Sequence, residues 1–493
     1  DIYTLSLHDA LPISFMRICK TPFFAAVIIS LAACSTNPAT GARQFTGLMS
    51  PGQESSVGAS EHQKVEQQFG FYNDPKLTAY VNEVGNKVTK DTERADVQYK
   101  FYVIDSPIVN AFALPGGYIY VSRGLLALAN SEAELAAVLS HETGHITARH
   151  SAERYSHGVV TSLGAAVLGA AVGSDGVSQA LGVGSNLYLS SYSRGQENEA
   201  DMLGLRYMTR GGYEPSAMSS FLKSLQNDTS LESRMQGGDG GDSTSYFSTH
   251  PATAERVSST LSQAANYPKG GAVNHDRHLQ MIENMIYGDS EKQGFVRGNS
   301  FFHPGLGFAF NVPEGFTIEN QPSQVVAVSK NGAAIIFDLA NDAGDPMIYL
   351  TQNWMKNEAV EKPENISISG MPAATAGFAG NLNGKPVTIR LVAIRFGNKM
   401  ARFQVAIPQG ANASLVNALK TSTYSFRPLN ESERQAVRPY RVYSIMAGNS
   451  DTVSTMAQRM PEGALREERF RVLNGLGSGE GVKAGQKYKV IGN

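Results

Sequence analysis

The chain has little cysteine and no long apolar run. Only two of its 493 residues are cysteines, Cys19 and Cys34. If a signal peptide is removed before Cys34, one cysteine remains, so the mature protein has no intramolecular disulfide. The apolar run at the N-terminus, Phe23–Ala33, is shorter than the roughly 20 residues that span a bilayer. It therefore fits the core of a signal peptide better than a membrane-spanning helix.

An excess of positive charge is also missing. The chain has 42 Lys+Arg against 44 Asp+Glu, and no basic cluster stands out. Because nucleic-acid binding needs such a cluster to contact phosphates, we exclude nucleic acid as a partner. The length is more than one average core requires, so the sequence predicts a multidomain protein.

The N-terminus has the pattern of an exported protein. Arg17 and Lys20 precede the apolar run, which ends in Leu-Ala-Ala-Cys, and this ending resembles a bacterial lipobox. We expect residues 16–33 to be a lipoprotein signal peptide and Cys34 to carry the lipid that contacts the membrane. Ser35, in place of Asp, favours the outer membrane of a bacterial cell envelope, on the periplasmic side. An ordinary secretory signal with a chance cysteine is the alternative.

Two short segments flank this signal. Residues 1–15 place acidic and turn-forming residues before the basic region, so we interpret them as a non-native leader with Met16 as the true start. Residues 34–53 are rich in Ser, Thr, Gly and Pro, which predicts a flexible tether between the lipid and the fold.

Residues 54–290 are predicted to form a mainly helical domain. Apolar residues recur at intervals of three and four, with one short pair of strands, "YKFYVID" and "GGYIYVS", between the helices. The predicted helices are Lys76–Asp91, Ser131–Tyr155, Glu197–Arg210 and Pro215–Leu225. The Gly/Ala-rich stretch after Tyr155 predicts a closely packed helix followed by a loop, and Met235–Ser245 has the composition of a surface loop.

The pattern changes to strands after about Ser300. Segments such as "PVTIRLVAIRF" and "MARFQVAIP" place apolar residues at every second position, which predicts an antiparallel α+β domain over residues 300–427. The segment "NESERQAVRP" is interpreted as a linker. Residues 439–493 then follow the order strand, helix, helix, strand.

The segment "LSHETGHITARHS" carries the clearest chemical signal. His141 and His145 are four residues apart, so on a helix both imidazoles can reach one metal ion. Glu142 lies about 100° round the helix, where it can act as a general base on a metal-activated water. Ser131 and Glu134 form a capping box that starts this helix. Two histidines alone are not sufficient, because catalytic zinc needs three protein ligands.

The third ligand is predicted in "SRGQENEADMLGLRYM". Glu197 and Asp201 are four residues apart on a helical pattern, so both lie on one face. Glu197 can then bind the ion, while Asp201 accepts a hydrogen bond from the distal nitrogen of a ligating histidine, which we expect to be His141. Glu199 points to another side and is expected to be solvated. Ordinary surface charges are the alternative for this pair.

Together these motifs resemble metallopeptidase family 48, a gluzincin family of zinc endopeptidases. "NAFALPGGYIYVSRGLL" and "STHP" also match, and the resemblance covers roughly residues 37–265. It implies a zincin-type fold with one zinc ion, held by His141, His145 and Glu197, with Glu142 as the general base and Asp201 supporting a ligand. His250, of "STHP", is expected near the metal, where it blocks the open position or steadies the transition state; a structural histidine is the alternative. The resemblance also implies an edge strand for an extended peptide substrate, formed by Ala113, Leu114, Pro115, Gly116 and Gly117. His62, His150 and His157 match nothing and are interpreted as surface or core histidines.

The C-terminal segments resemble other families. "FFHPGLGFAFNVPEGF" is similar to the opening of the PsbP/Mog-type fold, and residues 439–493 resemble a LysM module, which implies peptidoglycan as a partner. The segment "AGNSDT" departs from the tight turn of that family, which puts glycan binding in doubt.

Two functions follow from these predictions. The first is a metalloendopeptidase that acts on misfolded or maturing proteins of the cell envelope. The second is an envelope lipoprotein that serves as a chaperone, scaffold or peptidoglycan-binding module. The presence of the base Glu142 favours the enzyme, because a scaffold does not need it.

Overall fold

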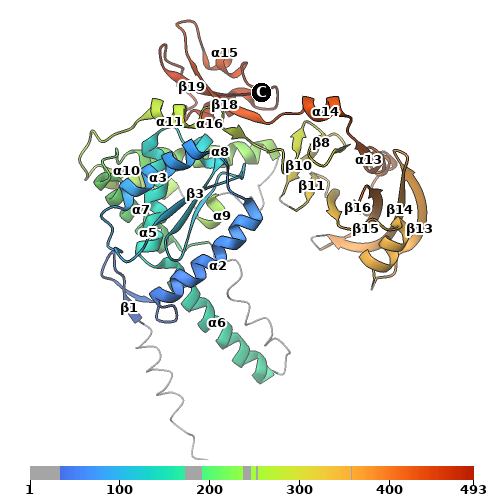
Figure 1. Ribbon diagram of the computed structural model, residues 1–493, viewed down its shortest axis with the longest axis horizontal. Coiled ribbons are helices and arrows are strands. Elements are labelled where there is room, and N and C mark those ends of the chain that lie inside the picture. The colour runs from blue at the N-terminus through green and yellow to red at the C-terminus, as the bar shows by residue number, and fades with distance from the viewer. Residues whose placement is uncertain are drawn as a thin grey trace, which may run out of the picture.

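A computed structural model describes most of the chain. The described residues are 34–172, 191–236, 246–250, 254–321, 323–356, 358–382 and 384–493. The predicted leader and signal peptide lie outside them. Figure 1 shows a helical region at the left, a sheet-rich region at the right, and a small C-terminal module above the helical region. The protein is therefore a multidomain α+β protein, as predicted.

Helices dominate the N-terminal half, as the three-and-four spacing predicts. They are α2 (Pro51–Phe69), α3 (Pro75–Thr89), α4 (Arg123–Leu128), α5 (Glu132–Thr147), α6 (His150–Val172), α7 (Arg194–Arg210), α8 (Ala217–Gln236), α9 (Tyr246–Thr249), α10 (Ala254–Ala264) and α11 (His275–Ile282). The Gly/Ala-rich stretch is helical up to the end of α6, which projects away from the helical region. None of the helices in the described ranges is long and apolar enough to cross a membrane.

One predicted helix is in fact two. The prediction of a continuous helix over Ser131–Tyr155 was wrong, because α5 ends at Thr147 and α6 begins at His150. The break lies at Arg149, whose φ of 57° is left-handed and cannot continue a helix. Its guanidinium is held by Glu54 at 2.7 Å and by the carbonyl of Met49 at 2.6 Å.

The segment predicted as a flexible tether is folded. Strands β1 (Cys34–Thr36) and β2 (Arg43–Phe45) pair as an antiparallel hairpin. In the loop between them, Asn37 is buried, and its side-chain oxygen accepts from the backbone N–H of Ala39. The polar composition of residues 34–53 thus reflects turn chemistry rather than flexibility.

A three-stranded sheet lies beside the helices, in the order β3-β5-β4. Its strands are β3 (Lys100–Ile104), β4 (Ala111–Leu114) and β5 (Tyr118–Ser122), with β3 parallel and β4 antiparallel to β5. Ala113 and Leu114 lie on the edge strand β4. Pro115, Gly116 and Gly117, predicted to continue it, form a turn instead. Both glycines have positive φ, and a Cβ on Gly116 would lie 2.9 Å from the Cα of Ser55 in α2.

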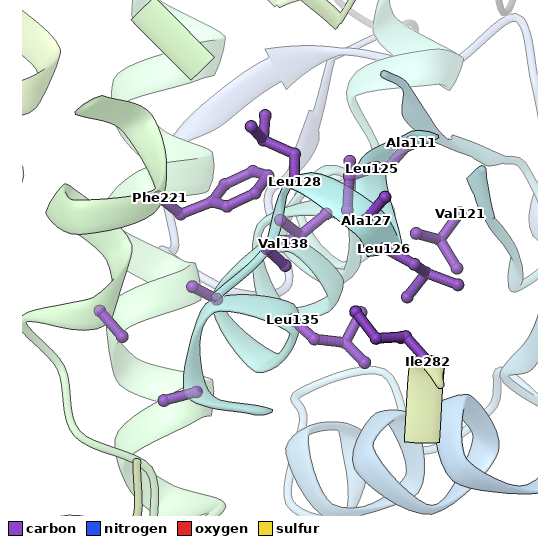
Figure 2. Packing of buried hydrophobic residues seen from close by; sticks show 14 of the residues in the cluster. Ala111, Val121, Leu125, Leu126, Ala127, Leu128, Leu135, Val138, Phe221 and Ile282 are labelled. Carbon is purple, nitrogen blue, oxygen red and sulfur yellow. The ribbon is translucent and has the colours of Figure 1, made fainter. Parts of the chain in front are cut away.

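Helix α5 runs through the centre of the helical region. Figure 2 shows Leu135 and Val138 of α5 packed among Leu125 to Leu128 of α4, Phe221 of α8 and Ile282 of α11. All 16 residues of α5 are buried. Its polar side chains therefore lie in the core, where each needs a partner.

The sheet-rich region follows the predicted alternation. A seven-stranded antiparallel sheet has the order β10-β11-β12-β16-β15-β14-β13, and a four-stranded sheet has the order β17-β9-β8-β7. The elements are β7 (Phe295–Arg297), β8 (Ser300–His303), β9 (Phe308–Asn311), β10 (Phe316–Asn320), β11 (Val325–Ser329), β12 (Ala334–Ala340), α12 (Pro346–Ile348), η3 (Tyr349–Trp354), β13 (Glu361–Ile368), β14 (Met371–Leu382), β15 (Lys385–Phe396), β16 (Lys399–Pro408), α13 (Ala413–Tyr424) and β17 (Arg427–Pro428). Phenylalanines from both sheets, including Phe308, Phe337 and Phe403, share one core.

The C-terminal module has the predicted order of elements. These are β18 (Tyr440–Met446), α15 (Val453–Ala457), α16 (Arg466–Leu473) and β19 (Lys487–Gly492). The segment predicted as a plain linker contains a short helix, α14 (Glu431–Ala436). Strand β18 also pairs with β6 (Ile286–Tyr287), so the sheet order is β19-β18-β6. The module is thus joined to the end of the helical region by a shared sheet.

Candidate active site

Helices α5 and α7 cross closely enough to bring their polar residues together. Glycines stand at the crossing: a Cβ on Gly144 of α5 would lie 3.0 Å from the carbonyl oxygen of Ala200, and one on Gly204 of α7 would lie 3.2 Å from the backbone nitrogen of His141. Larger residues here would push the helices apart. The close crossing places Glu197 of α7 against the histidines of α5.

The three predicted ligands meet in one cluster. The Nε2 atoms of His141 and His145 are 3.1 Å apart. Glu197 places one carboxylate oxygen 3.5 Å from Nε2 of His141 and the other 3.4 Å from Nε2 of His145. All three side chains are buried. The residues that the sequence singled out from two helices therefore face the same point.

His250 completes the cluster. It follows the short helix α9, and its Nδ1 lies 3.0 Å from Oε1 of Glu197 and 3.3 Å from Nε2 of His141. One ligand atom from each of the four side chains lies within 4.8 Å of the others. His250 therefore lies beside the predicted metal ligands.

The four donor atoms fit a zinc ion. Zinc bonds of 2.0 to 2.1 Å in a tetrahedron give edges of about 3.3 Å between donors. Five separations among the three imidazole nitrogens and the two carboxylate oxygens of Glu197 run from 3.0 to 3.5 Å. Three imidazoles and one carboxylate are also ligand types that zinc accepts.

The charge of the cluster suits a cation. Burial raises the pKa of Glu197, but the surrounding histidines, His250 first, outweigh burial and hold that pKa well below its ordinary value. Burial keeps the pKa of His145 well below its ordinary value, so this imidazole stays neutral as a ligand must. Burial lowers the pKa of His141 as well, yet Asp201 and Glu197 raise it to about 9. These carboxylates favour positive charge at this point.

Glu142 lies beside the cluster and outside it. Its Oε1 is 3.5 Å from Nε2 of His250 and accepts from the hydroxyl of Tyr246 at 3.4 Å. Its Oε2 is buried and has no hydrogen-bond partner within the described residues. A buried carboxylate oxygen without a donor is a place for a water molecule.

Asp201 supports His141, the contact predicted from the sequence. Its Oδ1 lies 2.8 Å from Nδ1 of His141. Arg256 of α10 holds Asp201 through two hydrogen bonds of 2.7 Å, and its Nη1 lies 2.6 Å from Glu197. Burial raises the pKa of Asp201, but Arg256 and then His141 lower it overall. Arg256 belongs to no motif, so it could not be selected from the sequence.

His145 has an equivalent support that the sequence analysis missed. Its Nδ1 lies 2.8 Å from Nδ1 of His150, and Nε2 of His150 lies 3.0 Å from Glu199. Glu199 also accepts from Asn37 at 2.9 Å and from Thr40 at 2.8 Å. His150 is a core histidine, one of the two interpretations given above, although its contact with His145 was not foreseen. The prediction of a solvated Glu199 was wrong, because its carboxylate is only partly exposed and has three partners. The helix break at Arg149 is what turns His150 back toward His145.

Aromatic rings cover the histidines. Tyr192 stacks on His145 with ring centres 3.7 Å apart, and the guanidinium of Arg154 lies 3.7 Å above Tyr192. Tyr246 stacks on His250 at 4.4 Å. The structure thus describes a closed form of the site. Two further histidines that matched no motif lie away from the site: His62 hydrogen-bonds Tyr120 at 2.7 Å, and His157 packs on Phe45.

A helix bearing two histidines and a glutamate, met by a glutamate from a second helix, defines a metallopeptidase domain of the zincin type. Residues 75–264 match the model of Peptidase family M48, so this part of the chain is similar to that family. Zinc is the metal on which this family depends, and the cluster of four side chains could hold such an ion.

Curated proteins show the same relationship. The chain is 30% identical over 201 residues to a beta-barrel assembly-enhancing protease of Yersinia pestis, covering 39% of this chain and 40% of that protein. It is 28% identical over 342 residues to the Escherichia coli K12 protein of that name, covering 64% and 67%. It is 33% identical over 182 residues to the mitochondrial metalloendopeptidase OMA1 of Schizosaccharomyces pombe, covering 36% and 51%.

The solved structures that match the chain are only distantly similar to it. The cyanobacterial PsbP of Synechocystis matches 27% of this chain at 10% identity, with a TM-score of 0.22. A likeness at this level carries no argument, so the PsbP-type fold stays a prediction.

Proposed function

We propose that the chain is a zinc-dependent endopeptidase that cleaves misfolded or maturing proteins of the bacterial cell envelope. The observation that carries this proposal is the meeting of His141, His145 and Glu197 beside Glu142, whose Oε2 has no partner among the described residues. A metal site that only stabilises the fold does not need an unpaired carboxylate oxygen beside it. A hydrolase needs one to take a proton from water.

The side chains divide the reaction among them. His141, His145 and Glu197 hold the ion, and a bound zinc supplies the Lewis acidity that polarises a peptide carbonyl and acidifies water. Glu142 takes a proton from the attacking water at Oε2 and later delivers it to the leaving amine. Asp201 and Arg256 fix the orientation of His141, and His150 with Glu199 fixes that of His145.

His250 keeps this site closed in the structure described. Its Nδ1 stands in the fourth donor position, where a catalytic site needs room for water and substrate. Its Nε2 also lies 3.5 Å from Glu142, so it occupies the space beside the base. We infer that cleavage requires His250 to leave, and that the enzyme is latent until α9 moves. The alternative, a role in steadying the transition state, requires the same side chain to return after opening.

The edge strand β4 suits the substrate. An extended peptide can add to such an edge through backbone hydrogen bonds. The carbonyl of Val109, just before β4, accepts from the backbone N–H of Tyr246 at 2.9 Å. Helix α9 therefore uses the carbonyl of Val109, next to the edge strand β4, while it holds His250 in the cluster of metal ligands. Movement of α9 would free both positions together, with Ala113 and Leu114 contacting the substrate.

Location and further partners are part of the same proposal. We propose a lipid on Cys34 and an outer-membrane, periplasm-facing location, supported by the lipobox pattern and by the names of the bacterial relatives. Peptidoglycan is proposed as a partner of the LysM-like module, supported by the order of its elements. The loop that departs from the family pattern is closed by its own residues, since Asp451 accepts from the N–H of Gly448 at 2.8 Å.

Chelation of the metal tests the activity directly. The purified protein is incubated with unfolded casein, and the new fragments are measured by electrophoresis. We expect slow cleavage that stops when zinc is removed with a chelator and returns when zinc is added back. Cleavage that continues at the same rate without metal would exclude this mechanism, and a contaminating protease is recognised because Glu142→Gln does not affect it.

A further inference from the structure

A second hollow lies away from the zinc cluster. A cleft of about 600 Å³ opens where α8, the C-terminal module and the segment after β6 meet. Its apolar wall is formed by Leu128, Leu231, Tyr287, Val472 and Leu473 among others. A hollow of this size and composition is typical of ligand sites.

Two carboxylates on α8 line this cleft. Asp228 and Glu232 are four residues apart, so they lie on one face of the helix. Neither makes a hydrogen bond or an ion pair with any of the residues that the structure describes. Burial, and then the charge of Glu232, raises the pKa of Asp228 to about 7.

Asp228 and Glu232 are partly buried, and three fully buried carboxylates elsewhere in the helical region are each paired with an arginine. Glu54 is held by Arg94 and Arg149. Asp105 is held by Arg123 at 2.8 Å, and Glu132 by Arg277 at 2.6 Å. A confined carboxylate without a cation costs free energy, and such groups are kept where a ligand supplies the missing charge.

The two arginines that line the cleft, Arg297 and Arg469, do not form ion pairs with Asp228 or Glu232. The guanidinium of Arg297 lies 4.0 Å over the ring of Tyr440 and donates to the carbonyl of Arg438. Arg469 belongs to α16, and it is not among the groups that shift the pKa of Asp228. Its guanidinium makes no hydrogen bond or ion pair with the described residues, so it can donate to carbonyl oxygens of a ligand.

We propose that this cleft binds an extended polypeptide segment in which a lysine or arginine stands next to apolar residues. The basic side chain pairs with Asp228 and Glu232, the apolar neighbours contact Leu231 and Leu473, and Arg469 donates to a backbone carbonyl. A compact cation alone would leave the apolar wall uncovered.

The cleft is positioned to assist the peptidase. Val109 lines the cleft and also accepts from the backbone N–H of Tyr246, whose ring stacks on His250. The cleft and the proposed latch therefore share one loop. The polypeptide is then a substrate segment held outside the zinc site, an assignment that rests on the proposed function.

Binding is measured separately from cleavage, so the two proposals can fail independently. The full chain carries Glu142→Gln to prevent hydrolysis. The probe is a dye-labelled, acetylated and amidated peptide of alternating lysine and leucine, followed by fluorescence anisotropy at pH 8. The first comparison uses a peptide with glutamate in place of lysine, which needs no change in the cleft. We expect the lysine peptide to bind and the glutamate peptide to bind at least about tenfold more weakly.

The second comparison changes the cleft. D228N/E232Q is expected to lose at least about tenfold in affinity for the lysine peptide, because charge-assisted hydrogen bonds to both carboxylates are removed. The control E255Q/D276N removes two exposed carboxylates of α10 and α11 and is expected to stay within about twofold. Affinity is also expected to rise between pH 6 and 8 as Asp228 ionises.

Three results would overturn the proposal. One is equal binding of the lysine and glutamate peptides. Another is unchanged affinity in D228N/E232Q. The third is displacement of the lysine peptide by spermidine at the concentration at which the unlabelled peptide displaces it, which would make the cleft a simple cation site.

Discussion

At the scale of single residues, the site depends on how its histidines are held. Each imidazole of α5 has a polar partner on its far nitrogen: Asp201 for His141 and His150 for His145. Such partners fix the ring orientation and the basicity of a metal ligand. The chain from His145 through His150 and Glu199 ends in the N-terminal hairpin, so the segment after Cys34 is linked to the metal site.

His150→Ala tests this support. The variant should keep the fold but bind zinc about 10- to 100-fold more weakly, because His145 loses the partner that orients it. Zinc affinity is measured by competition with a chelating dye. His157→Ala is the matched control, since His157 lies on the same helix and is exposed. Equal zinc affinity in the wild type and His150→Ala would contradict the support described here.

Much of the site follows from spacing along the helices, and the rest depends on tertiary structure. His141, Glu142, His145, Glu197 and Asp201 could be selected because their intervals put them on defined helix faces. His150 and Arg256 could not. His150 contacts His145 only because Arg149, between the two helices, has a left-handed backbone conformation. Arg256 lies on a third helix and belongs to no motif.

At the scale of elements, the crossing of α5 and α7 sets the distance between the ligands. Gly144 faces the backbone of α7, whereas Gly195, near the start of α7, has only the hydroxyl of Ser193 within 4 Å, at 3.9 Å from a Cβ. The two glycines thus differ in the space around them and not in secondary structure.

Gly144→Ala should therefore weaken zinc binding and lower the free energy of unfolding by about 1–3 kcal/mol, because the helices must separate. Gly195→Ala should be neutral or stabilising by up to about 1 kcal/mol, since alanine favours helix over glycine. Chemical denaturation and zinc titration of both variants measure these effects. Equal effects of the two substitutions would show that the crossing does not control the site.

The strands show where sequence patterns are sufficient and where they are not. Alternation located β15 and β16, because alternate residues of each strand enter the same core, such as Val392 of β15 and Phe403 of β16. The other face of β15 is covered by a second buried cluster, which contains Leu391 and Ala393. The pairing of β18 with β6 could not be foreseen, since Ile286–Tyr287 is only two residues long and is joined to its partner across the whole sheet-rich region. Local pattern carries no information about such a contact.

At the scale of the whole molecule, the C-terminal module and the helical region share one core. Residues as distant as Val81 and Ile491 belong to the same buried cluster. Lys489 of β19 is buried and donates to the carbonyls of Ala127 at 2.6 Å and Ala129 at 2.7 Å, at the end of α4. Burial lowers the pKa of Lys489 to about 7, with Glu134 opposing it.

Lys489→Met should destabilise the helical region as well as the module. Carbonyls at the end of α4 lose their donor while staying buried, at about 1–3 kcal/mol for each unsatisfied group. We expect a lower melting temperature with both parts unfolding in one transition. Lys483→Met, at an exposed position of the same module, is the control. An unchanged transition for Lys489→Met would show that the module is only loosely attached.

The central claim is that Glu142 works at a zinc site which His250 closes. The most direct measurement is the rate of peptide-bond cleavage in unfolded casein by zinc-loaded His250→Ala, with and without Glu142→Gln, at equal zinc content. The account predicts that His250→Ala cleaves faster than the wild type, and that adding Glu142→Gln reduces cleavage to the background while one zinc per chain remains bound. Equal cleavage by His250→Ala and the double variant would contradict it.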